Sequence, residues 1–287
     1  MLWKNIMKEP LVSTLICTYN SENTIHWALQ SVMDQTYENQ EILILDNNSK
    51  DNTLDILKDY QKKDKRIKLF SLWKNLWPYK WLNYLLDQSK WKYIAIQDHD
   101  DVRHPEKLKK QIEFLESNEK YIWCGCGFMD YYSHINKWRI EQWKWEESNK
   151  VFHTSLVFRN GNYRYDNNND YFGDARFMQY ILSGNKKRMY KLQDVLLIHY
   201  MKRRGENFSS CWFKTNMQNI KRFLEVSPHN LYNVCLLIYL TILWIFPKKI
   251  KVLIDWFLLK IFLNDKNNIE NIVKKNKNIK TMMEYFN

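Results

Sequence analysis

Three aspartates lie close together in the segment QDHDD, where Asp98, Asp100 and Asp101 follow the apolar run 93–96 after Gln97. Carboxylates at this spacing repel one another, so a chain that keeps them together must offset the repulsion. Mg²⁺ and Mn²⁺ prefer such oxygen ligands and keep open positions for substrate phosphates. The alternative is a solvated acidic turn. It is weakened because the preceding run is apolar and the chain carries a net charge of +12.

A sheet must position this acidic turn, because strand-like and helix-like segments alternate through the first half of the chain. Apolar, β-branched runs predict strands at 11–17, 41–46, 66–72 and 92–97. Amphipathic spacing predicts helices at 21–35, 51–63, 79–89 and 104–117. This alternation indicates βαβ units and a mostly parallel sheet. Ligands of such sheets bind at the carboxyl ends of the strands, so the polar segments there should converge on one edge.

The second half is less regular. Strand-like runs occupy 121–132, 151–159 and 188–201, and a helix-like segment occupies 173–184. The uncharged run 230–246 and the apolar run 252–263 predict a helical hairpin, which either lies in a membrane interface or covers the core. The first run is slightly short of the ~20 residues that span a bilayer. We expect the polar tail, 264–280, to be frayed.

Composition narrows the class of protein. With 45% hydrophobic and 26% charged residues, the chain should be globular. The positive charge favours an anionic partner: nucleic acid, a phosphorylated small molecule or an anionic membrane. The five cysteines are scattered without zinc-site spacing, which indicates reduced thiols in a cytosolic protein. Residues 1–14 contain no signal-peptide-like apolar stretch, so we expect no secretion.

Several of these segments, in this order and spacing, resemble glycosyltransferase family 2. The resemblance is close over 10–117 and looser to about 205. It implies an α/β, Rossmann-like GT-A domain at 1–225, with a mostly parallel central sheet flanked by helices. Residues 10–117 would be its nucleotide-sugar-binding half and 118–225 its acceptor half. Residues 226–287 would form a C-terminal helical extension, made of the apolar hairpin and the polar tail.

The resemblance also implies a nucleotide site at the ends of the first two strands. Thr18, Tyr19 and Asn20 match the loop that cradles the nucleobase, with Tyr19 placed to stack on it. Asp46 and Asn47 match the turn that bonds the base or ribose. Members that use uridine nucleotides often have a second Asp at the position of Asn47. An amide oxygen can still accept a hydrogen bond from the base, so UDP is expected, with dTDP and GDP left open.

The acidic turn matches the D-x-D motif of the family. By this match Asp98 contacts ribose or metal, and Asp100 binds Mn²⁺ or Mg²⁺ directly. Asp101 would not bind the metal directly but would help to orient the residues that do. His99 is expected to be a solvated spacer.

Asp174, in the segment GDARF, matches the family position of the catalytic base. The acceptor hydroxyl must lose its proton as it attacks the anomeric carbon. Without the resemblance, Asp174 would be interpreted as a helix cap. One base opposite one metal-held leaving group implies an inverting hexosyltransferase that acts by a single displacement.

Two further groups are candidates for the site. Lys202, Arg203 and Arg204 either close over the diphosphate as a flap or form a solvated basic loop. His153 either lines the acceptor site or is structural. The implied partners are a nucleotide-sugar donor and a glycan or lipid-linked acceptor, with peripheral contact at the cytosolic membrane face and no nucleic acid.

Tryptophan is unusually common, with 13 Trp against 6 Gly. Trp77 and Trp91, and further Trp81 and Trp123, stand where the resembling family has glycine. Glycine suits such turns because it tolerates φ > 0, which a bulky residue does not. We hypothesise that the source gene reads a stop codon as glycine and that these positions are glycine in the native protein. The alternative is a Trp-rich enzyme with an aromatic sugar platform.

Two other functions fit parts of the sequence. DHDDV superficially fits the D-x-D-x-[TV] motif of aspartyl phosphohydrolases, but those place the motif on the first strand, whereas here it follows the fourth. A nucleic-acid-binding protein would fit the charge and the aromatic residues. The sequence shows no recognised nucleic-acid motif, and its acidic loops would repel phosphates unless a metal intervened.

Overall fold

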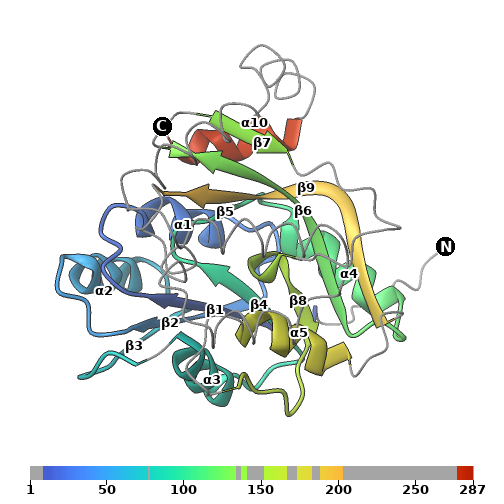
Figure 1. The fold of residues 1–287 in the computed structure, drawn as a ribbon, viewed down its shortest axis with the longest axis horizontal. Helices are drawn as coiled ribbons and strands as arrows, with labels where there is room; N and C mark the ends of the chain where they lie inside the picture. The colour runs from blue at the N-terminus through green and yellow to red at the C-terminus, as the bar shows by residue number, and fades with distance from the viewer. Residues whose placement is uncertain are drawn as a thin grey trace, which may run out of the picture.

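The computed structural model describes residues 9–76, 78–133, 137–140, 152–166, 173–182, 188–202 and 277–286. Within these ranges nine strands form one sheet, in the order β3-β2-β1-β4-β8-β6-β9-β5, with β7 beside β6 (Figure 1). The strands are β1 (Val12–Thr18), β2 (Gln40–Asp46), β3 (Ile67–Ser71), β4 (Tyr93–Asp98), β5 (Val102–Arg103), β6 (Trp123–Tyr132), β7 (Lys137–Ile140), β8 (Val157–Arg159) and β9 (Met189–Met201). The α-helices are α1 (Ile25–Met33), α2 (Thr53–Lys63), α3 (Pro78–Gln88), α4 (Lys107–Ser117), α5 (Gly173–Leu182) and α10 (Lys277–Met283).

The first half is the predicted parallel sheet. Strand β1 pairs in parallel with β2 on one side and β4 on the other, and β3 extends the sheet beyond β2. Helix α1 begins later than predicted because residues 21–24 form a turn, in which the backbone N–H groups of Thr24 and Ile25 both donate to the Ser21 carbonyl. The α/β architecture expected from the sequence is confirmed.

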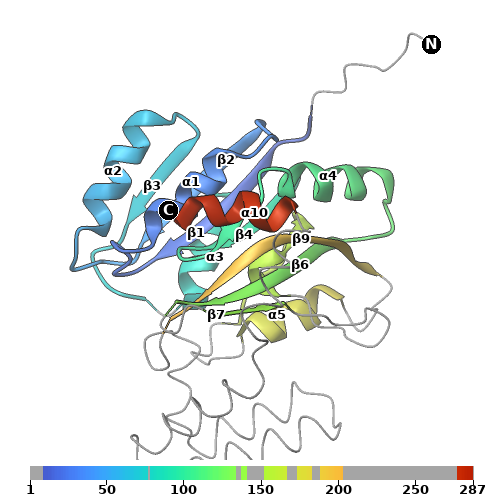
Figure 2. The same cartoon turned by 90° about the horizontal axis from the view of Figure 1, so that it is seen from above.

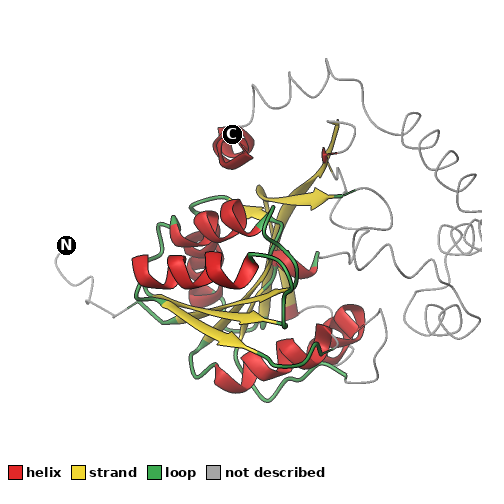
Figure 3. Cartoon of the chain, turned by 90° about the vertical axis from the view of Figure 1, so that its left-hand side faces the viewer, coloured by secondary structure: helices red, strands yellow, loops and turns green. Residues whose placement is uncertain are grey.

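Helices cover both faces of this sheet (Figure 3). Side chains alternate along a strand, so Leu15 packs with α3 and α5 on one face, whereas its neighbour Ile16 packs with α1 and α2 on the other. Both side chains are fully buried. These two apolar layers hold the strand ends at a fixed edge.

The second half mixes parallel and antiparallel pairings, and β6 and β9 run in the same direction as β4. Strand β8 pairs antiparallel with both β4 and β6, and β6 runs parallel to β9. In the described part of the predicted strand 151–159, only Val157–Arg159 is a strand, because His153–Ser155 forms a 3-10 turn. In that turn the Ser155 N–H and hydroxyl both donate to the Phe152 carbonyl, at 2.9 and 2.6 Å.

The C-terminal residues return to the sheet. Helix α10 lies over β9 (Figure 2), with Ile279 and Met282 fully buried against Val102 and Ile198. The 3-10 turn Glu284–Phe286 follows it. The tail expected to be frayed therefore ends in a docked helix. The predicted hairpin at 230–263 lies outside the described residues, and no described helix is long and apolar enough to cross a membrane.

The tryptophans differ in environment. Trp123 is fully buried and Trp91 is 43% exposed. The indole N–H groups of Trp81 and Trp123 are buried and have no hydrogen-bond partner among the described residues, which costs free energy. Among the described residues only Asn20 and Asn48 combine a side chain with positive φ, so strain in the left-handed region does not support the glycine hypothesis at Trp81, Trp91 or Trp123. Trp77 lies outside the described residues.

Candidate active site

The carboxyl ends of β1, β2 and β4 meet at one edge of the sheet, as the alternation predicted. Register pairs Thr18 with Asp46, and Cys17 with Asp98. The residues expected to bind nucleotide and the residues expected to bind metal are therefore on adjacent strands.

Two loops at this edge are joined by hydrogen bonds. The Asn20 N–H donates to Ser49 Oγ at 3.0 Å, and the Lys50 N–H donates to Asn20 Oδ1 at 2.8 Å. Asn20 and Asn48 have φ of 49° and 63°, a conformation that asparagine tolerates better than most residues. The side chain of Asn20 thus shapes the loop.

The inner residues of the two loops bind protein groups. Thr18 is fully buried and donates its hydroxyl to Ser21 Oγ at 2.8 Å. Asn47, also buried, donates to the Leu76 carbonyl at 2.9 Å and accepts from the Leu76 N–H at 2.7 Å. Both side chains brace the loops from within. Tyr19, in contrast, is 38% exposed, which leaves its ring accessible for stacking.

Of the two carboxylate oxygens of Asp46, one accepts a hydrogen bond from a described residue and the other does not. Asp46 Oδ2 accepts the Ser49 N–H at 3.2 Å, whereas Oδ1 is buried without a partner in the described part of the chain. Buried acceptors are nearly always hydrogen-bonded in folded proteins. Oδ1 is therefore a suitable acceptor for an N–H or O–H group of a bound ligand.

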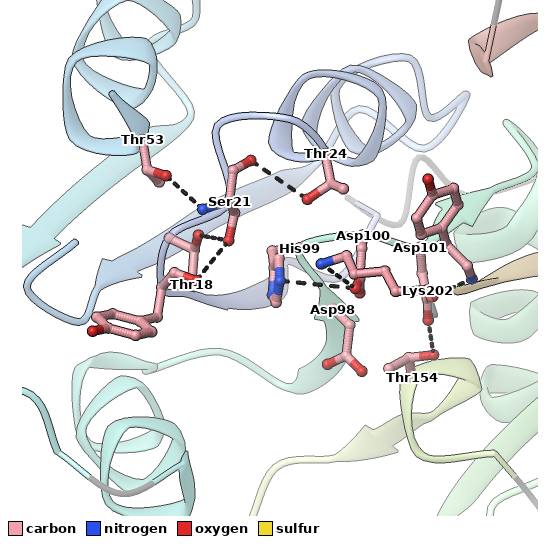
Figure 4. A network of polar contacts seen from close by, with 12 residues as sticks. Thr18, Ser21, Thr24, Thr53, Asp98, His99, Asp100, Asp101, Thr154 and Lys202 are labelled. Carbon is pink, nitrogen blue, oxygen red and sulfur yellow. Dashed lines mark hydrogen bonds and ion pairs between the residues drawn. The ribbon is translucent and has the colours of Figure 1, made fainter. Parts of the chain in front are cut away.

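The three aspartates of the acidic turn have different surroundings (Figure 4). Asp101 is fully buried and accepts the Thr154 hydroxyl at 2.6 Å and the Tyr200 N–H at 3.0 Å, which joins the turn to the second half of the chain. The Lys202 Nζ lies 3.2 Å from Asp100 Oδ2. No described side chain hydrogen-bonds to the Asp98 carboxylate. His99 is mostly buried, so it is not the solvated spacer that was expected.

These surroundings give the carboxyl groups different acidities. Burial, followed by the charges of Asp101 and Asp100, raises the pKa of Asp98 well above its usual value. Burial likewise raises the pKa of Asp101 to about 6. Burial also acts on Asp100, but His99 and Lys202 outweigh it and lower its pKa. Asp98 is thus the acid that most lacks a nearby cation.

A divalent cation would suit this arrangement. The described residues contain no group of three His, Cys, Asp or Glu side chains placed to hold a metal. Mg²⁺ and related ions, however, are commonly bound by one or two carboxylates, with substrate phosphates and waters completing the shell. Asp98, buried beside Asp101 and Asp100 and two residues from Asp100, would suit an ion shared with a diphosphate.

Sequence reasoning missed a buried ion pair behind the turn. His199 on β9 lies beside Asp130 on β6, with Nδ1 2.8 Å from Oδ1. Burial alone would lower the pKa of His199, but Asp101 and Asp130 outweigh burial and raise it to about 9. The sequence carried no local signal of this pair because β6 and β9 are far apart in the chain.

Asp174 lies in the first turn of α5, and an aromatic stack fixes that helix. The rings of Phe177 and Tyr165 stack at 3.8 Å, and Tyr165 stacks on Tyr79 at 5.7 Å. A Cβ at Gly173 would lie 2.5 Å from the Tyr79 ring, so only glycine allows this close approach. The first turn of α5, which contains Asp174, is thereby held close against α3.

His153 is part of the same cluster. Its Nε2 lies 2.6 Å from the Tyr165 hydroxyl. Burial raises the pKa of Tyr165, and the charge of Asp174 raises it further. The charge of Asp174 also contributes, after burial and the nearer carboxylates, to the raised pKa of Asp98. His153, Tyr165, Asp174 and Asp98 therefore lie within electrostatic reach of one another. Arg203 and Arg204 lie outside the described residues.

Comparison with known proteins identifies the family. The model of glycosyl transferase family 2 matches residues 13–190. The chain belongs to this family.

An uncharacterized glycosyltransferase of Haemophilus influenzae is 41% identical over 110 residues, which cover 38% of this chain and 34% of that protein. TuaG of Bacillus subtilis, a glycosyltransferase named for teichuronic acid biosynthesis, is 35% identical over 123 residues, which cover 43% of this chain and 47% of TuaG. The chain thus spans about a third to a half of the length of these relatives.

Solved structures of glycosyltransferases share the fold. S. aureus TarS, crystallised with UDP, superposes with a TM-score of 0.56 at 17% identity, over 77% of this chain and 68% of that one. The mannosyltransferase PcManGT of Pyrobaculum calidifontis, in complex with GDP-Man and Mn²⁺, gives 0.55 at 13% identity, over 82% and 70%. Membership of this family favours a glycosyltransferase over the phosphohydrolase and nucleic-acid-binding alternatives.

Proposed function

We propose that this glycosyltransferase moves a sugar from a UDP-linked donor to a hydroxyl of a glycan or lipid-linked acceptor, with inversion and with Mn²⁺ or Mg²⁺. The observation that carries the proposal is the placement of Asp46 and Asp98 at the ends of β2 and β4, the strands on either side of β1, with Asp100 two residues on. Asp46 Oδ1 has no partner among the described residues, and Asp98 is buried beside two other carboxyl groups. The TarS crystals with UDP and the PcManGT crystals with GDP-Man and Mn²⁺ support a nucleotide sugar and a metal.

In this proposal the nucleoside lies over the loops at 18–20 and 46–49. Tyr19 stacks on the base, and Asp46 Oδ1 accepts a hydrogen bond from the base or ribose. Thr18, Asn20 and Asn47 keep the loops in place through the contacts described above. The metal, held by Asp98 and Asp100, would neutralise the diphosphate as it leaves.

Asp174 is the proposed base. Its carboxylate removes the proton of the acceptor hydroxyl, whose oxygen bonds to the anomeric carbon. The bond from that carbon to the diphosphate oxygen breaks, and its electron pair leaves with the nucleoside diphosphate. Because the attack and the departure occur on opposite faces, the configuration inverts. His153 lies beside this helix and is proposed to line the acceptor side.

Peripheral attachment to the cytosolic face of the membrane is also proposed. It is supported by the apolar sequence of 230–246 and 252–263, which flanks a lysine-rich segment. A lipid-linked or cell-surface acceptor would be reached from that position.

The proposal is tested by screening nucleotide sugars with Mn²⁺ for release of nucleoside diphosphate, with and without glycan acceptors. Asp174→Asn should bind the donor normally but slow transfer by about 10²-fold or more, because it cannot take the proton. Asp194→Asn, at an exposed carboxylate that pairs with Lys110, is the control and should remain active. Full activity of Asp174→Asn would show that another group is the base.

A further inference from the structure

The acidic turn already holds a cation from the protein itself. The Nζ of Lys202, in the residue after β9, lies 3.2 Å from Asp100 Oδ2, and the two side chains are only 23% and 15% exposed. His99 Nε2 lies 3.8 Å from the same oxygen. Figure 4 shows both groups directed at Asp100 while the Asp98 carboxylate has no such contact. The carboxylate proposed to bind metal most directly is therefore the one already neutralised.

The backbone before Lys202 is firmly placed. The Tyr200 N–H donates to Asp101 Oδ1 at 3.0 Å, and Tyr200 and Met201 pair in register with β6. The Lys202 side chain, in contrast, is a flexible four-carbon stem with a single charged end. The ammonium can therefore change partner while β9 and the acidic turn stay in place.

A metal and the Lys202 ammonium cannot both lie against the same oxygen without strong repulsion. A bound donor carries a diphosphate. Its oxygens would lie next to Asp100, where the Lys202 ammonium can bind them in place of the Asp100 carboxylate. We propose that Lys202 is a positioning residue with two partners: Asp100 when no donor is bound, and the diphosphate when donor and metal are bound together. This inference rests on the proposed function.

The consequence is cooperative binding. Without nucleotide, Lys202 competes with the metal for Asp100, so the metal alone binds weakly. With nucleotide, Lys202 moves to the phosphates, which removes the competition and adds a contact to the donor. Metal and donor then strengthen each other's binding by the same factor, as linkage requires.

The test measures Mn²⁺ binding by the loss of the free-ion electron paramagnetic resonance signal, first without nucleotide and then with UDP. Lys202→Met keeps the length of the side chain but removes its charge. It should bind Mn²⁺ alone about five- to tenfold more tightly than wild type, and UDP with saturating Mn²⁺ more weakly by a similar factor. Lys202→Arg should behave as wild type does. Lys110→Met removes a cation that is also 3.2 Å from a carboxylate, but from that of Asp194, outside the acidic turn, and should change neither affinity.

The outcomes separate the two proposals. If Lys202→Met and wild type bind Mn²⁺ alone equally, while both bind UDP with Mn²⁺, the inference about Lys202 is overturned and the proposed function stands. If Mn²⁺ binds to none of the folded variants, with or without UDP, both the metal site and the role of Lys202 are overturned. Opposite shifts of the two affinities in Lys202→Met would establish the inference.

Discussion

Replacing His199 with glutamine should remove a pH-dependent part of the free energy of unfolding. Asp101 and Asp130 raise the pKa of His199 from its ordinary value of 6.5 to about 9, against the effect of burial. A raised pKa in the folded state means that the proton stabilises the fold. This stabilisation is complete below pH 6.5 and is lost as the pH rises to about 9.

The size of the effect follows from the shift. At about 1.4 kcal/mol per pH unit, the difference in pKa corresponds to ~3 kcal/mol. His199 is 21% exposed, so solvent screening reduces this only moderately. Lys107 acts in the opposite direction over part of the same range, because burial lowers its pKa to about 7. The quantity to compare is therefore the difference between wild type and His199→Gln.

Urea denaturation in EDTA, at intervals from pH 6 to 9.5, gives this difference. Wild type should exceed His199→Gln by an amount that falls by ~3 kcal/mol across the range. His26→Gln, at an exposed histidine, is the control and should follow the wild-type curve. A difference that stays constant with pH would mean that His199 contributes packing and not charge, and would refute the reasoning.

Three further outcomes are expected. Met282→Ala should lower the free energy of unfolding, measured by urea denaturation, by about 2–5 kcal/mol, because Met282 is fully buried between α10 and the sheet. An unchanged free energy of unfolding would mean that α10 does not dock in solution. Tyr165→Phe should slow transfer to the acceptor without changing donor affinity, because it removes the hydroxyl that contacts His153 but keeps the aromatic stack. An equal loss of transfer rate and donor affinity would contradict this. Mass spectrometry of the protein from its source should find glycine at 77, 81, 91 and 123, whereas ordinary tryptophan codons at 77, 81 and 91 would end that hypothesis.

The four βα units could be predicted from sequence because their signals are local. Alternating side chains such as Leu15 and Ile16 mark strands, and the strand-end rule then brings Asp46 and Asp98 to one edge. Neighbouring polar residues were harder to assign. Thr18 and Asn47 are predicted to contact ligand, and the structure adds that each side chain also hydrogen-bonds to a protein group, Ser21 and Leu76 respectively; the ligand contact stays a prediction.

The second half depended on long-range pairing, which no local pattern encodes. Asp130 and His199 are partners only because β6 and β9 run side by side in one register. Asp101 similarly joins Thr154 and Tyr200, which are distant in sequence. The docking of the C-terminal helix could not be predicted from its mostly polar sequence, because only two of its residues, Ile279 and Met282, are fully buried.

Calorimetric titration of UDP into wild type and Asp100→Ala, with Mn²⁺ and with EDTA, tests most directly whether the acidic turn binds a metal-nucleotide complex. Wild type should bind UDP with Mn²⁺ and lose most of that affinity in EDTA. Asp100→Ala should bind weakly in both, whereas Asp59→Ala, at an exposed helix position, should match wild type. Equal UDP affinity in Asp100→Ala and wild type, or wild-type binding that EDTA leaves unchanged, would contradict the account.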